Sequence, residues 1–111
     1  MRDPELMLRL LRVAAEDRAG EIHHLNLPRH DLEHYSHHLD LLVDAEHLRW
    51  KTALGEPFQV ARMTNAGYDF LNAVDQGETH RRRFIELFNA GRPYVEAAKS
   101  VVEAVTKITG G

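Results

Sequence analysis

Apolar residues recur at helical spacing near the start of the chain and again over residues 32–46. The first run follows an Asp-Pro pair at residues 3–4, which suits the N-cap and first turn of a helix, and stops before Gly20. The second run follows Asp31, another N-cap candidate. We therefore predict two α-helices, with residues 21–27 as an extended connector or short strand between them.

The spacing then changes from helical to alternating. Apolar residues and cations alternate over residues 48–52, and a second run begins at Phe58 after the turn sequence LGEP. Two period-two runs around a glycine-containing turn predict a β-hairpin. Thr64 is placed to cap another helix, which ends at Gly77.

The last third of the chain predicts a helical hairpin. Its first helix buries Phe84, Leu87 and Phe88, and the sequence GRP separates it from the second. The second helix carries a heptad-like seam of Tyr94, Ala98, Val101, Val105 and Ile108. We predict that this seam is a homodimer interface; the alternative is that it packs only within its own chain.

Helix, short extended piece, helix, β-hairpin and helix is the order of a winged helix. In that arrangement the helix before the hairpin is offered to DNA, and the hairpin is the wing. The predicted fold is mainly α with a small β-hairpin. A winged helix-turn-helix domain occupies residues 1–77, and a C-terminal αα-hairpin at residues 78–111 serves in dimerisation, all within one compact unit.

Two stretches carry a resemblance to known winged-helix proteins. YSHHLDLLVDAEHL resembles the xxHLxxLxxAGL that ends recognition helices in PadR-like and MarR-like regulators, and ARMTNAGYDFL resembles the LTxxGxxFL after their wing. Together with the opening MRDPELMLRLL, the chain resembles domain-of-unknown-function family 2513, a group of small bacterial and phage proteins, over roughly residues 1–90. The resemblance implies a winged-helix-like fold and a phage or prophage association.

The sequence departs from this pattern at one turn. The usual DAGL reads DAEHL, so Glu46 and His47 must form the turn after the second helix without glycine. Further along, Thr64 starts the next helix, and Gly67 permits a close approach to the sheet or to the first helix.

The charge is small overall and unevenly distributed. The 111 residues carry a formal net charge of −3, so no global basic field attracts nucleic acid. Residues 1–48 hold five Lys/Arg against ten Asp/Glu, whereas residues 49–62 hold three cations against one carboxylate. There is no cysteine, no secretory signal and no apolar stretch of membrane-spanning length, so we expect a cytoplasmic protein.

Histidine is concentrated in the second predicted helix, whose apolar stripe faces the core. The outward face carries His30, His34, His37 and Leu41 among acidic residues, with His38 at its border. Histidines four residues apart can share a metal ion, but no HExxH motif is present, and we predict a solvated face with no metal and no cofactor. The sequence does not decide whether this face binds a metal or senses pH.

The sequence lacks the constellations of an enzyme. It has no cysteine nucleophile, no GxSxG motif, no phosphate-cradling glycine loop and no suitably paired acids, so we predict no catalytic activity and no catalytic residue.

A non-enzymatic regulator that binds double-stranded DNA is the leading functional hypothesis. The candidate contacts are Arg29, His30, His34, His37, Arg49, Lys51 and Arg62. The alternative is a winged-helix adaptor or inhibitor that binds another protein through the exposed face around Leu41.

Overall fold

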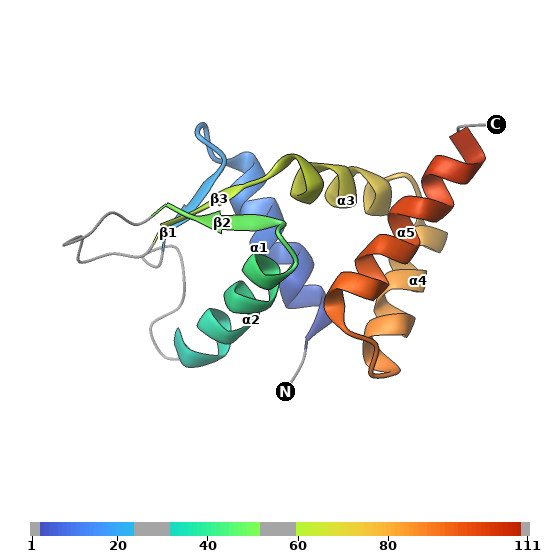
Figure 1. Cartoon of the computed structure of the whole chain (residues 1–111), viewed down its shortest axis with the longest axis horizontal. Helices are drawn as coiled ribbons and strands as arrows, with labels where there is room; N and C mark the ends of the chain where they lie inside the picture. The colour runs from blue at the N-terminus through green and yellow to red at the C-terminus, as the bar shows by residue number, and fades with distance from the viewer. Residues whose placement is uncertain (1–2, 24–31, 52–59, 110–111) are drawn as a thin grey trace.

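The computed structural model describes residues 3–23, 32–51 and 60–109, and the side chains of Leu32 and residues 107–109 are not described. The elements are α1 (Pro4–Glu16), β1 (Glu21–His23), α2 (Leu32–Asp44), β2 (Leu48–Trp50), β3 (Val60–Met63), α3 (Asn65–Asp75), α4 (Glu78–Asn89) and α5 (Tyr94–Thr109). Within these residues the chain is mainly helical with one small antiparallel sheet. The sheet lies at one end of the molecule, and α4 and α5 lie at the other (Figure 1).

Helix α1 begins as its sequence predicts and runs through the centre of the molecule. The Asp3 carboxylate accepts a hydrogen bond from the Leu6 N–H at 3.2 Å, and Pro4 occupies the first helical position. The helix ends at Glu16, and Gly20 takes a φ of +70° just before β1. Seven residues of α1 are buried, so this helix forms the middle of the core.

The sheet has the strand order β1-β3-β2, with both pairs antiparallel. The predicted pairing of the two hairpin strands is confirmed, while the turn between them lies outside the described residues. The predicted extended segment is confirmed for Glu21–His23, which form β1 and pair with β3. One face of the sheet is apolar and buries Ile22, Leu48, Ala61 and Met63 in the core.

The turn between α2 and β2 is formed without glycine, as the sequence requires. Glu46 adopts a φ of +62°, a left-handed conformation that is uncommon for residues other than glycine. Thr64 supports this turn, because its hydroxyl donates to the Glu46 carbonyl and its N–H donates to the His47 carbonyl at 3.1 Å. Thr64 also caps α3 by accepting the Gly67 N–H at 3.1 Å.

Gly67 makes the predicted close approach at the edge of the sheet, where its main neighbour is the turn before β2. A Cβ built at Gly67 would lie 2.4 Å from the backbone carbonyl oxygen of His47, which precedes β2, and 3.3 Å from the Met63 side chain of β3. The reason is that the Thr64 cap brings the first turn of α3 directly onto the turn that precedes β2.

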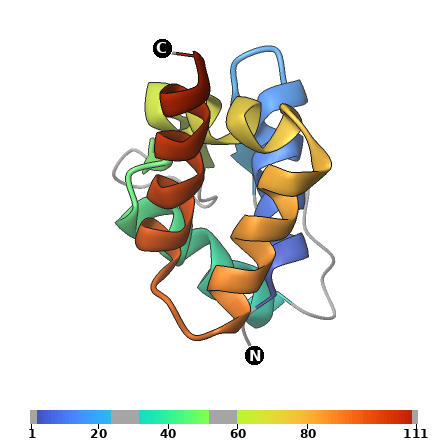
Figure 2. The same cartoon turned by 90° about the vertical axis from the view of Figure 1, so that its right-hand side faces the viewer.

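The C-terminal helices share one core with the rest of the chain. Phe70 of α3, Phe84 and Phe88 of α4, and Tyr94 of α5 form an aromatic cluster, with the Phe70 and Phe84 rings 5.0 Å apart. Helix α5 packs against both α3 and α4, and α4 also contacts α1. In Figure 2, α4 and α5 run side by side across the end of the molecule.

Three of the five residues predicted as a dimer seam are instead buried within one chain. Tyr94, Ala98 and Val101 are 4%, 1% and 0% exposed, because α3 and α4 cover this side of α5. These three residues therefore pack within their own chain, which is the alternative that the sequence left open. Val105 is partly exposed, and the side chain of Ile108 lies outside the described residues.

Replacing Gly67 with alanine should destabilise the protein. A Cβ at this position would collide with the His47 carbonyl oxygen, which is backbone and cannot easily move. We expect a loss of about 1–3 kcal/mol in the free energy of unfolding, although alanine is favoured over glycine in helices by roughly 1 kcal/mol. Urea denaturation measures the change.

Gly77→Ala is the matched control for this substitution. Gly77 has an extended backbone conformation, and nothing lies within 4 Å of a Cβ built there. Because Gly77 is the N-cap of α4 and glycine is a better N-cap than alanine, its replacement should cost no more than about 1 kcal/mol in the free energy of unfolding. Equal effects of the two substitutions would contradict the close contact at Gly67.

Candidate nucleic-acid interface

Two arginines face each other on the outer side of the sheet. Arg49 of β2 and Arg62 of β3 are cross-strand partners, and both are exposed. Neither guanidinium has a hydrogen-bond or ion-pair partner among the described residues. On its other side Arg62 faces Glu21 of β1, a carboxylate that already pairs with Lys51. Like charges placed opposite each other destabilise a sheet, so an anion bound between Arg49 and Arg62 would relieve the repulsion that Glu21 leaves.

The third predicted cation of the sheet is already paired. The Lys51 ammonium forms an ion pair with the Glu21 carboxylate, which also lies 3.7 Å from the ring of His23. The free positive charge of the outer sheet face, within the described part of the chain, therefore belongs mainly to Arg49 and Arg62.

A shallow cleft of about 540 Å³ begins at these arginines. It is bounded by Arg49, Lys51 and Arg62 and by the first residues of α3, Asn65 and Ala66. Backbone dipoles place partial positive charge at the start of a helix, which adds to the two guanidinium groups. Glu46 borders the cleft and Glu21 faces Arg62 from β1, and these are the carboxylates that an incoming anion would have to avoid.

The predicted DNA-facing helix offers less positive charge than the sheet. Arg29 and His30 lie outside the described residues. On α2, His34 is half-buried and His37 is exposed. The other exposed charged residues of this helix are acidic: Glu33, Asp40 and Asp44. The structure thus brings Arg49, Lys51 and Arg62 together, and it leaves His37 on a mostly acidic face.

Two histidines of α2 and the following turn are buried, whereas the sequence places His34 and His37 on the outward face. His38, placed by the sequence at the border of the face, is fully buried. His47, which our sequence reasoning left without a site role, is 7% exposed and lies in the aromatic cluster. Two features of the sequence could have indicated this burial: His38 stands beside the apolar stripe of α2, and His47 stands in the turn that lacks the usual glycine.

His47 connects the α2–β2 turn to α5. Its Nδ1 shares a hydrogen bond of 2.6 Å with the buried Tyr94 hydroxyl, and its ring stacks on Phe70 at 5.2 Å. Burial lowers the pKa of His47 to about 4 and raises the pKa of Tyr94 well above its ordinary value. The pair is therefore neutral and structural at physiological pH.

Two further observations concern metal ions and membranes. Among residues 3–23, 32–51 and 60–109, no three His, Asp or Glu side chains are grouped so that they could hold a metal ion. None of the helices described is long and apolar enough to cross a membrane.

Comparison with family models, curated proteins and solved structures found no match to this chain.

The burial of His47 predicts that acid destabilises the protein. An unfolded histidine takes up a proton near pH 6.5, whereas folded His47 does so near 4. The unfolded state therefore binds more protons as the pH falls from 6.5 toward 4, and the free energy of unfolding should decrease over this window, by at most about 3 kcal/mol. Urea denaturation at several pH values measures the decrease.

The variant His47→Gln should lose part of this pH dependence, because glutamine does not titrate. It should also be less stable at pH 7, because the buried Tyr94 hydroxyl loses its hydrogen bond to the His47 ring. His80→Gln, a replacement at a half-exposed position, controls for the removal of a histidine as such. A wild-type stability that is constant between pH 6.5 and 4.5 would rule out the effect.

Proposed function

We propose that the protein is a non-enzymatic DNA-binding protein with a winged-helix arrangement. The order of elements and the pairing of β1 with β3 support this arrangement, with α2 before the hairpin and β2–β3 as the wing. The observation that carries the proposal is the unpaired, cross-strand couple of Arg49 and Arg62. The resemblance to family 2513 favours a small regulator of bacterial or phage origin.

The charge distribution indicates how such binding would work. Phosphate contacts supply most non-specific affinity, and each contact contributes roughly 0.9 to the salt slope on duplex DNA. Two free arginines per chain would give a slope of about 2, which corresponds to weak, salt-sensitive binding. Base reading from α2 would depend on His37 and on carboxylates, which accept hydrogen bonds from cytosine amino groups.

Binding to a fluorescent duplex across a salt series tests the proposal. The double variant Arg49→Ala with Arg62→Ala should weaken binding to every sequence and reduce the salt slope by about 2. Both side chains are exposed, so the fold should be retained.

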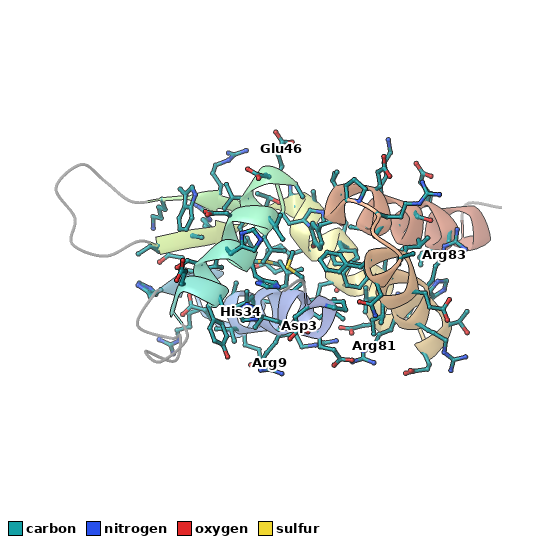
Figure 3. The ribbon with its side chains drawn as sticks, turned by 90° about the horizontal axis from the view of Figure 1, so that it is seen from below. Asp3, Arg9, His34, Glu46, Arg81 and Arg83 are labelled. Atoms are coloured by element: carbon teal, nitrogen blue, oxygen red, sulfur yellow. The ribbon has the colours of Figure 1, made fainter. Side chains whose placement is uncertain are left out.

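Arg9→Ala with Arg82→Ala is the matched control, because it removes the same charge from exposed positions on α1 and α4. In Figure 3, Arg9 lies on the opposite side of the molecule from Glu46, which borders the cleft. Equal losses in the two double variants would show that net charge, and not this site, governs binding. Absence of binding at low salt would exclude the proposal.

A groove between α2 and α5 supports a second candidate function, protein contact. It measures about 400 Å³ and is lined by Leu41, Asp44, Ala45, Pro93, Tyr94 and Val95. Leu41, predicted as an exposed partner residue, is half-buried, whereas Val95 is 50% exposed. Figure 2 shows the first turns of α5 beside α2.

A second copy of the chain is the partner that this groove fits best. Lys99 is exposed one turn beyond Val95, and Asp44 borders the groove; neither has an ion-pair partner within the described ranges. In a two-fold dimer, Val95 of each copy would enter the groove of the other, and each Lys99 would approach an Asp44. This interface would replace the buried seam as the dimer contact.

Light scattering at tens of micromolar tests this dimer. Val95→Asp should give a folded monomer, whereas Tyr68→Asp, at the other well-exposed large apolar residue described, should remain dimeric. Lys99→Asp and Asp44→Lys should each weaken the dimer, and their combination should restore it. A wild-type protein that is already monomeric would exclude this function for the groove.

A further inference from the structure

His38 connects the start of α1 to the middle of α2 through both nitrogens of its ring. Nδ1 lies 2.9 Å from the carbonyl oxygen of His34, and Nε2 lies 2.9 Å from the backbone nitrogen of Asp3. A carbonyl can only accept, so Nδ1 must carry the proton, and a backbone N–H can only donate, so Nε2 must be the acceptor. These two contacts define a neutral ring in one tautomer.

We propose that His38 is a proton-sensitive latch that holds the N-terminus of α1 against α2 while its ring is neutral. A proton added to Nε2 would turn this acceptor into a donor directed at the Asp3 N–H. The two donors would repel, and the imidazolium would also lie at the positive end of the α1 dipole. Protonation therefore breaks the contact between the two helices.

The surroundings of the ring set the pH range of this latch. Burial is the main effect and lowers the pKa of His38, and the charged forms of His34 and His37 lower it further. The hydrogen bond to the His34 carbonyl and the Asp3 carboxylate act in the opposite direction but do not outweigh burial. The latch is thus closed at neutral pH and opens only below the ordinary histidine pKa of about 6.5.

The contacts around His38 concentrate titratable groups at one junction. The His34 ring lies 4.4 Å from the His38 ring, and the His37 ring lies 5.7 Å from it, both on α2. From α1, the Asp3 carboxylate faces the site while it caps its own helix at the Leu6 N–H. Figure 3 shows Asp3 and His34 near each other where α1 and α2 meet.

The consequence of opening is a change in how α2 is held. Asp3 is the N-cap of α1, so loss of its contact with His38 frees the first turn of the central helix from α2. Helix α2 also bears the outward-facing His37 and one wall of the groove. Acid would therefore loosen the wall of the groove that α2 provides, while the sheet arginines lie on other elements.

Nuclear magnetic resonance on the unmodified 111-residue chain tests the latch directly. Long-range proton–nitrogen spectra at pH 7.5 should show His38 with Nδ1 protonated and Nε2 as the acceptor. On acidification, the Asp3 amide signal should lose its hydrogen-bonded shift with the same midpoint as the His38 ring. The opposite tautomer, or an Asp3 signal that stays constant while His38 titrates, would overturn the proposal.

His38→Gln and His37→Gln form a matched pair for the same measurement. The glutamine oxygen at position 38 can accept the Asp3 N–H but does not titrate, so the acid-dependent change at Asp3 should vanish. The replacement at exposed position 37 should leave that change in place. If His38→Gln does not fold, the wild-type titration still decides, and retention of the Asp3 change in a folded His38→Gln protein would refute the latch.

Discussion

The turn between α2 and β2 is the contact on which the rest of the structure depends. At this turn the His47 carbonyl receives the Thr64 N–H at 3.1 Å, and the His47 ring shares its hydrogen bond with Tyr94. One short segment therefore joins the sheet, the first turn of α3 and the start of α5. The left-handed backbone of Glu46 costs on the order of 1–2 kcal/mol, which the hydrogen bond from the Thr64 hydroxyl helps to offset.

This joint also positions the candidate binding face. Arg62 lies two residues before Thr64, and Arg49 lies two residues after His47, so both arginines flank the hydrogen bonds of the turn. The His47–Tyr94 pair of this joint is buried, and a buried polar pair is stabilising only while both members are satisfied. The geometry of the cationic cleft and the packing of the C-terminal helices are thus consequences of the same few contacts.

The local features of the fold could be predicted from the sequence, and the long-range ones could not. The caps at Asp3 and Thr64 and the hairpin strands depend on neighbouring residues, so spacing and residue type were sufficient. The burial of His38 depends on the Asp3 N–H, which lies 35 residues away in the sequence. The burial of the apolar seam of α5 depends on its packing against α3 and α4. For the site, the cations of the sheet were predictable, but the pairing of Lys51 with Glu21 across the sheet was not.

The separation of charge determines how the two candidate functions relate. The sheet presents free arginines, whereas the outward face of α2 presents Glu33, Asp40 and Asp44. Deep insertion of α2 into a DNA groove would bring these three carboxylates toward phosphates, and the like charges would repel. Physiological salt screens such repulsion only when the charges are more than about 8 Å apart. A duplex held by the sheet arginines avoids this repulsion. Because the cationic cleft and the α2–α5 groove share no lining residue, a dimer formed through the groove would leave both pairs of arginines available to one polyanion.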